Sequence, residues 1–182
     1  MGLVNIIDVD ETIEVALRYA TADNFLKKPV YPVHLCLLRY DTAIKLKTAN
    51  EEFKKNGYHI KIWDGYRPLD VQQIFWDALP DSRFMANPKR GSRHNRGGAV
   101  DVTLVDENGK ELEMPTGFDD FTERASRLFT GNPRHVQENV DYLTNIMIKS
   151  GFTTIDSEWW HFDDRDWEKY EILNIDLLAY DK

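Results

Sequence analysis

The residues best suited to chemistry lie between Ser92 and Asp101, in the stretch Ser-Arg-His-Asn-Arg-Gly-Gly-Ala-Val-Asp. His94 and Asp101 are seven residues apart, and Gly97 and Gly98 between them permit a backbone path that other residues resist. A carboxylate inside an otherwise apolar segment needs a cation, a metal or several hydrogen-bond donors. This pair alone supports a metal site and a structural salt bridge or hydrogen bond about equally.

A second stretch, Glu158-Trp159-Trp160-His161, favours the metal. Together the two stretches supply His94, Asp101 and His161 as ligands. Three protein ligands with one open position are typical of a catalytic zinc site. The remaining acid, Glu158, is suited to act as general base for the water that attacks the substrate.

These motifs, Ser-x-His-x-x-Gly-x-Ala-x-Asp followed by Glu-x-x-His, resemble those of the zinc peptidases that include the VanX-type D-alanyl-D-alanine dipeptidases. The stretches 19–25 and 63–68 and the pair Phe118-Asp119 match the same branch. The resemblance runs from about Tyr19 to His161, in the family's order and at similar spacings. It implies hydrolysis of D-alanyl-D-alanine to free D-alanine, with one Zn²⁺ per chain held by His94, Asp101 and His161.

The resemblance also implies roles for residues outside the metal cluster. Arg67 would stabilise the tetrahedral intermediate, since a guanidinium can donate two hydrogen bonds to an oxyanion, and Asp64 could hold that guanidinium. Asp119, with Tyr19, would bind the substrate's amino group. Ser92 would hydrogen-bond the substrate toward its carboxylate end.

Two other functions stay open from the sequence. One is a D,D- or L,D-carboxypeptidase or endopeptidase acting on peptidoglycan peptides, which would more often need export and would lack the amine-binding Asp119. The other is a non-catalytic zinc-containing binding domain, although a structural site usually closes with a fourth protein ligand and has no use for Glu158. A dipeptidase could serve glycopeptide resistance or recycling of cell-wall dipeptide, and both would use the same site.

Local patterns predict the elements that position these residues. Asp101 shares a strand face with Ala99 and Thr103, and Arg67 falls at a strand-to-helix junction. Asn108-Gly109 predicts a hairpin turn. We expect an α+β fold with a central antiparallel sheet flanked by helices, with strands over 13–19, 59–63, 99–104, 111–114 and 152–155 and helices from Asp41 or Thr42 to about 55, over 68–79 and over 132–150.

The Glu158 motif does not fit an ideal strand. Residues three apart on a strand point to opposite faces, so Glu158 and His161 need a bend or bulge to converge on one metal. We expect Trp159 and Trp160 to serve as wall and core. The stretch 81–93 is a surface loop that could also cover the site as a partial lid, and 163–182 is expected to wrap over the domain.

Composition limits the class of protein. The 182 residues suit a single domain over 1–182. The net charge of −8 argues against a nucleic-acid or anionic-membrane binder and says little about a small zwitterionic substrate. The expected partner, a small dipeptide, is implied by the family resemblance. Residues 1–14 contain no Lys or Arg and no apolar run of about 18 residues occurs, so we expect a cytoplasmic location. A single cysteine, Cys36, excludes an internal disulfide and is expected to be buried. Oligomeric state is not readable from the sequence.

Overall fold

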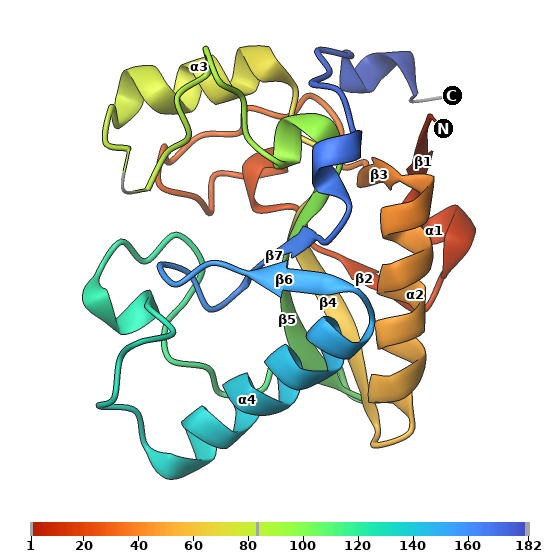
Figure 1. Ribbon diagram of the computed structural model, residues 1–182, viewed down its shortest axis with the longest axis vertical. Helices are drawn as coiled ribbons and strands as arrows, with labels where there is room; N and C mark the ends of the chain where they lie inside the picture. The colour runs from red at the N-terminus through yellow and green to blue at the C-terminus, as the bar shows by residue number, and fades with distance from the viewer. Residues whose placement is uncertain (1, 83, 181–182) are drawn as a thin grey trace.

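The computed structural model describes residues 2–82 and 84–180 and has an α+β architecture (Figure 1). Its central sheet has five strands in the order β2-β4-β5-β7-β6, and a second, two-stranded sheet pairs β1 with β3. The strands of the central sheet are β2 (Glu14–Val15), β4 (Tyr58–Asp64), β5 (Ala99–Asp106), β6 (Phe152–Thr154) and β7 (His161–Asp164), and the small sheet contains β1 (Leu3–Asn5) and β3 (Leu37–Arg39).

The predicted α+β class is confirmed, and the sheet is mixed at one edge. The pairs β4–β5, β5–β7 and β6–β7 are antiparallel, whereas the short β2 pairs in parallel with β4. The strand predicted over 13–19 is therefore much shorter than expected, because the chain turns into a 3-10 segment, Arg18–Ala20. The carbonyl of Tyr19 accepts hydrogen bonds from the amides of Val30 and Tyr31, which fixes Tyr19 in this turn instead of in the sheet.

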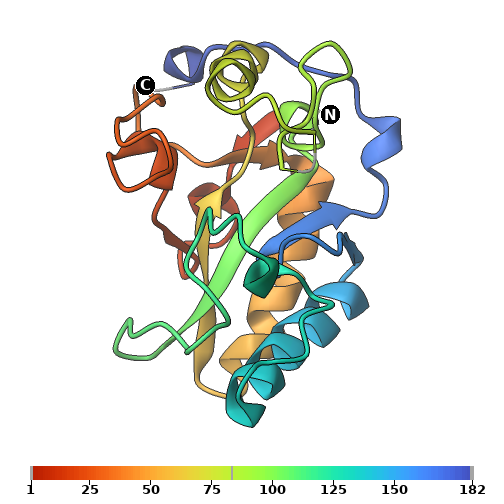
Figure 2. The same ribbon diagram turned by 90° about the vertical axis from the view of Figure 1, so that its left-hand side faces the viewer.

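β5 runs through the middle of the sheet (Figure 2) and is buried on both faces. Val100, Val102 and Leu104 join the apolar core, while Asp101 and Thr103 are buried on the opposite face. The predicted alternation is thus confirmed. One face of β5 therefore packs into the apolar core, and the other carries the carboxylate of Asp101.

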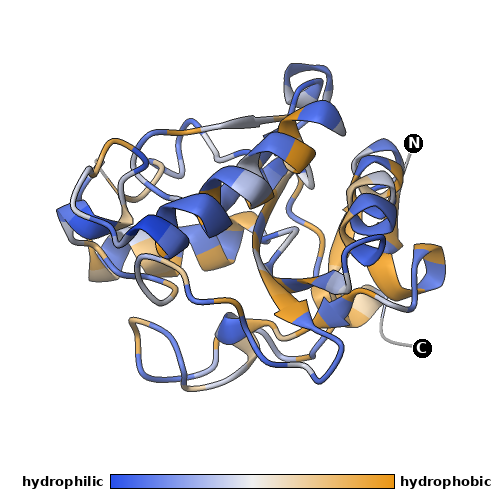
Figure 3. Cartoon of the chain, turned by 90° about the horizontal axis from the view of Figure 1, so that it is seen from below, coloured by the Kyte–Doolittle hydropathy of each residue, from blue (hydrophilic) through white to orange (hydrophobic). Residues whose placement is uncertain are grey.

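The helices α2 (Tyr40–Lys54) and α4 (Arg134–Lys149) pack against each other and against the sheet (Figure 1). Figure 3 shows that both helices carry hydrophobic as well as hydrophilic positions, as expected for helices with one buried face. The buried faces are the predicted ones: Ala43, Leu46, Ala49, Asn50 and Phe53 on α2, and Val136, Val140, Leu143 and Met147 on α4.

The helix α3 (Leu69–Ala78) begins directly after Pro68 and lies at one end of the molecule (Figure 1). Its buried side is narrower than the predicted stripe, because Ile74 is 41% exposed while Val71 and Phe75 are buried. Phe75 packs against the rings of Tyr19 and Phe25. A further short helix, α1 (Ile6–Val9), was not predicted. In the described part of the chain, no helix is long and apolar enough to cross a membrane.

The strand predicted over 111–114 is wrong, although the chain does reverse at Asn108-Gly109. The amide of Leu112 donates to the carbonyl of Leu104, and a single bridge joins Val105 to Glu111. Nearer the start of β5, the amide of Val102 donates to the carbonyl of Trp160 at 3.0 Å, and not to the segment 111–114.

The C-terminal segment lies over the domain as predicted. The amide of Leu173 donates to the carbonyl of Asn95 at 2.8 Å, and the amide of Ile175 donates to the Tyr66 hydroxyl at 2.7 Å. Gly98 makes this close approach possible, since a Cβ there would lie 3.0 Å from the ring of Tyr170.

The packing of α4 gives a stability prediction. Replacing the fully buried Leu143 by Ala removes apolar contacts and leaves a cavity, so the free energy of unfolding should fall by about 2–5 kcal/mol. Ile148 on the same helix is 42% exposed, and Ile148→Ala should change it by less than about 0.5 kcal/mol. Urea unfolding of both variants measures the difference. Equal losses would show that the assigned buried face of α4 is wrong.

Candidate active site

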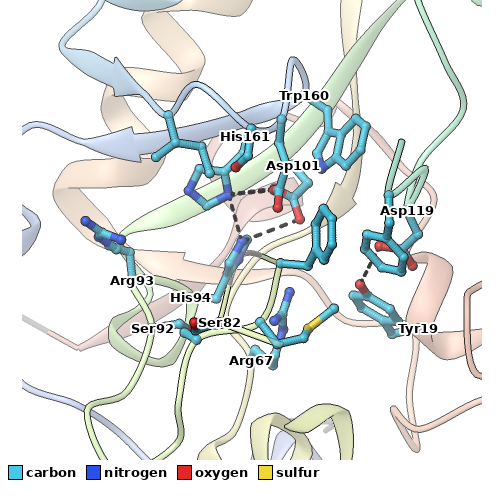
Figure 4. Close-up of a pocket in the computed structure, with 17 residues that line it drawn as sticks. Tyr19, Arg67, Ser82, Ser92, Arg93, His94, Asp101, Asp119, Trp160 and His161 are labelled. Carbon is cyan, nitrogen blue, oxygen red and sulfur yellow. Dashed lines mark hydrogen bonds and ion pairs between the residues drawn. The ribbon is translucent and has the colours of Figure 1, made fainter. Parts of the chain in front are cut away.

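Most of the residues singled out in the sequence line one cavity of about 290 Å³. Figure 4 shows the cluster of His94, Asp101 and His161 beside Tyr19 and Asp119. Asp64 is the one predicted site residue absent from the lining. The lining residues are Tyr19, Arg67, Ser82, Phe84, Met85, Ala86, Ser92, Arg93, His94, Asp101, Asp119, Phe121, Ile155, Ser157, Glu158, Trp160 and His161.

The three predicted metal ligands converge in this cavity. Nδ1 of His161 lies 3.0 Å from Oδ1 of Asp101, and Nε2 of His94 lies 3.4 Å from Oδ2 of Asp101. The two imidazole nitrogens are 3.3 Å apart. All three residues are buried, and their ligand atoms lie within 4.8 Å of one another.

Strand register brings two of these residues together. Asp101 on β5 and His161 on β7 are directly opposite in the antiparallel pair. His94 comes from a 3-10 turn, His94–Arg96, which ends at Gly97 in the left-handed conformation with φ 69°. A Cβ on Gly97 would lie 2.6 Å from a Leu3 methyl group, so both the conformation and the close approach require glycine.

Each imidazole is oriented by a hydrogen bond from its other nitrogen. Nδ1 of His94 donates to the carbonyl of Gly65 at 2.8 Å, so Nε2 faces Asp101. Nε2 of His161 lies 2.8 Å from Oδ1 of Asp163, so Nδ1 faces Asp101. Such outer partners fix the tautomer and direction of metal-binding histidines. Asp163 was not identified from the sequence, because its distance of two residues from His161 carries no motif.

Glu158 lies in the turn before β7, where the predicted bend occurs. Its Oε2 is 3.9 Å from Nδ1 of His161, and burial raises the pKa of its carboxyl. Arg127 holds this turn by donating to the carbonyls of Trp159 at 2.6 Å and His161 at 3.2 Å. No motif marks Arg127 in the sequence, because it lies in an irregular segment. Of the two tryptophans, Trp160 lines the cavity and Trp159 is fully buried, as predicted.

Arg67 follows β4 and precedes α3, at the predicted junction. Its Nε and Nη2 both donate to Oδ2 of Asp64, at 3.1 and 2.6 Å, and its guanidinium lies 4.7 Å from the ring centre of Phe75. Burial alone would lower the pKa of Arg67, but the Asp64 carboxylate raises it well above its usual value. Asp64 therefore acts by holding Arg67, and it is itself held by the hydroxyl of Tyr31 at 2.7 Å.

Asp119 presents a carboxylate without a cation. The Tyr19 hydroxyl donates to Oδ1 at 2.9 Å, while Oδ2 is buried and has no hydrogen-bond partner. Burial raises the pKa of Asp119 to about 7, and the hydrogen bond from Tyr19 only partly opposes this. The residue has φ 58°, a conformation uncommon outside glycine. A buried acceptor of this kind calls for a positively charged donor.

Ser92 and other described residues of the loop 81–93 form another part of the wall. Ser92 Oγ donates to the Asn95 side chain at 3.0 Å and accepts from the Asn95 amide at 3.2 Å, so it also fixes the turn that carries His94. The lining side chains of the loop include Met85, which is buried, and Arg93, which lies at the edge. The loop thus borders the cavity.

The chain matches the sequence profile of the peptidase M15 family, described as D-ala-D-ala dipeptidase, over residues 1–176. It belongs to this family. It is 38% identical to the D-alanyl-D-alanine dipeptidase of Escherichia coli (strain K12), over 88% of this chain and 83% of that protein. The enzymes of the same name from Enterococcus faecium and Enterococcus faecalis (strain ATCC 700802 / V583) are 34% and 32% identical. These matches cover 82% and 80% of this chain and 84% and 82% of those proteins.

The M15 family assignment agrees with the geometry of His94, Asp101 and His161, which suits a metal ion. Ligand atoms about 2.1 Å from a tetrahedral metal are about 3.4 Å apart, close to the separations between His94, Asp101 and His161. The cluster also favours positive charge. Burial would lower the pKa of His161, but Asp163 and Asp101 raise it to about 10, and the two histidines lower the pKa of Asp101 against the effect of burial. The donor set and its geometry therefore fit a zinc ion.

The raised pKa of Asp119 predicts a pH-dependent stability in the metal-free protein. The pKa is about 7 in the folded state and near 3.8 in the unfolded chain, so between these values the folded protein binds more protons. Stability should therefore fall as pH rises from about 4 to 7. Asp119→Asn removes this loss, so the variant should unfold at higher urea concentration than the native protein at pH 8, with a smaller difference at pH 4. Equal differences at both pH values would contradict the assignment.

Proposed function

We propose that this M15 family member hydrolyses D-alanyl-D-alanine to free D-alanine with one zinc ion per chain. The observation that carries the proposal is the pairing of two features in one cavity. One is the cluster of His94, Asp101 and His161 with Glu158 beside it. The other is the unpartnered carboxylate oxygen of Asp119, which suits the ammonium group of a free dipeptide.

His94, Asp101 and His161 would hold the zinc ion through Nε2, a carboxylate oxygen and Nδ1. Bound there, zinc would supply Lewis-acid polarisation of the scissile carbonyl and of the attacking water. Asp163 and the Gly65 carbonyl keep the two imidazoles in the required direction.

Glu158 supplies the proton transfers. Its carboxylate accepts a proton from the attacking water and then gives it to the departing amine of the second residue. The raised pKa of Glu158 brings it nearer to neutral pH, where one group can both accept and return a proton. Its position in a turn held by Arg127 keeps it beside the metal cluster.

Arg67 stabilises the charge that develops on the carbonyl oxygen. Its guanidinium is already fixed by Asp64 and lies in a buried site, so little reorganisation is needed when the oxyanion forms. The hydrogen bonds to Asp64 use Nε and one side of Nη2, which leaves further N–H groups of this lining residue for the substrate.

Asp119 and Tyr19 bind the free amino terminus, and Ser92 hydrogen-bonds the substrate toward its carboxylate end. An N-blocked peptide would leave the Asp119 carboxylate buried without a cation, which the site would reject. The same carboxylate argues against a carboxypeptidase acting on longer peptides. The position of Glu158 beside the cluster argues against a binding domain with a purely structural metal.

The proposed function is tested by measuring alanine release from D-alanyl-D-alanine by the zinc-loaded protein. L-alanyl-L-alanine and an N-blocked D,D-peptide serve as controls. Cleavage of the free D,D-dipeptide alone is the expected result. Cleavage of the blocked peptide would favour a carboxypeptidase. No cleavage of any peptide by protein with confirmed zinc would favour a binding domain.

Glu158→Gln should abolish turnover without loss of the metal. Glutamine keeps the size of the side chain but cannot accept the proton, so kcat should fall by at least about 10²-fold. Zinc content, measured by atomic absorption after dialysis, should stay at one per chain, because the three ligands are untouched. Retained activity would contradict the role of Glu158.

Asp119→Ala should impair the hydrolysis of the free dipeptide far more than the binding of zinc. Loss of a charge-assisted contact costs about 1.5–3 kcal/mol, or roughly 10–100-fold in kcat/KM. Steady-state kinetics on D-alanyl-D-alanine give this ratio. An unchanged kcat/KM would remove the support for amine recognition and favour the carboxypeptidase alternative.

A further inference from the structure

Two adjacent glutamines of α3 lie in opposite environments. Gln72 is fully buried, whereas Gln73 is exposed and donates to Asp77 one turn further along the helix. A buried primary amide needs partners for both its oxygen and its nitrogen. Gln72 finds these partners in two separate parts of the cavity wall.

The oxygen of Gln72 contacts Arg67, and its nitrogen contacts the loop 81–93. Oε1 accepts a hydrogen bond from Nη1 of Arg67 at 2.9 Å, and Nε2 donates to the carbonyl of Ala86 at 2.8 Å. Ala86 and its neighbour Met85 both line the cavity. One side chain therefore joins the guanidinium to the loop that borders the substrate space.

A neutral amide is well suited to this position. Asp64 already provides the negative charge beside Arg67, through Nε and Nη2. Gln72 binds the remaining terminal nitrogen, Nη1, and restricts rotation of the guanidinium without adding a second negative charge. The attraction of Arg67 for a developing oxyanion is thus preserved.

We propose that Gln72 is a positioning residue for the hydrolysis, and this inference rests on the proposed function. Gln72 fixes the guanidinium of Arg67 relative to the loop at Ala86. The group that donates to the oxyanion therefore keeps a constant position relative to the wall of the cavity. Gln72 acts through Arg67 and the loop, and it does not line the cavity itself.

The first test is Gln72→Met, which keeps the length of the side chain and removes both hydrogen bonds. Losing a hydrogen bond to a charged group should lower kcat on D-alanyl-D-alanine by at least about tenfold. Gln73→Met, on the exposed side of the same helix, is the matched control and should leave kcat unchanged. Equal kcat values for the two variants would overturn the inference.

A double-mutant cycle separates positioning from a general structural effect. If Gln72 acts through Arg67, then adding Gln72→Met to Arg67→Met should change kcat by less than about twofold. Multiplicative losses in the double variant would overturn the proposed coupling. Zinc content and the midpoint of thermal unfolding confirm that each variant is folded.

The contact with the loop is tested without activity. Lys89 and Arg90 are exposed, so trypsin cleavage after them reports opening of the loop. Cleavage should be faster in Gln72→Met than in Gln73→Met. It should also be faster in Gln72→Glu, which keeps the acceptor for Arg67 and loses the donor to Ala86. Unchanged cleavage rates would overturn this half of the inference.

The two levels of the proposal fail in different ways. A native protein that cleaves none of the peptides would refute the proposed function, while the trypsin assay would still decide the contact between Gln72 and the loop. A native protein that cleaves D-alanyl-D-alanine, with Gln72→Met equally active, would refute the inference alone.

Discussion

The pairing of β5 with β7 is the constraint on which the site depends. Antiparallel register places Asp101 directly opposite His161, and the 3.0 Å separation of their ligand atoms follows from that pairing. A shift by one residue would turn His161 to the opposite face of the sheet and separate the two groups. The hydrogen bond from the amide of Val102 to the carbonyl of Trp160 continues the ladder next to the site. The register of the two central strands therefore places two of the three predicted metal ligands.

The buried charges around the cavity form a set in which nearly every member has a partner. Arg67 is balanced by Asp64, and His161 by Asp101 and Asp163. An unpaired buried charge is costly, so each of these groups depends on its partner in the folded protein. Asp119 is the exception, since its Oδ2 is buried and has no hydrogen-bond partner. In the proposed reaction, the ammonium group of the substrate would supply the missing donor, and this cost would be recovered on binding.

The sequence predicted those parts of the site that depend on short-range patterns. Alternation along β5 placed Asp101 on the face opposite the core, and the spacing of Glu158 and His161 required the bend that the structure contains. The parallel edge strand β2 and the small sheet of β1 and β3 were not predicted. These strands are only two or three residues long, which is too short to show an alternating pattern. The supporting contacts of Asp163 and Gln72 also escaped, since they join segments whose proximity only the folded chain establishes. The metal ligands and the catalytic roles stay predictions.

The two hydrogen bonds that hold the C-terminal segment also bear on how the protein is made. The segment binds the carbonyl of Asn95, which follows His94 in the chain. It also binds the hydroxyl of Tyr66, which precedes Arg67 at the junction after β4. Ribosomes add about 5–20 residues per second, so roughly 4–15 seconds separate the synthesis of Asp101 from that of Ile175. β7 ends at Asp164, so for most of this interval β5 is an apolar strand with an unpaired edge. The residues of the predicted metal site therefore come from segments that are made several seconds apart, and the segment that binds beside His94 and Arg67 is made last.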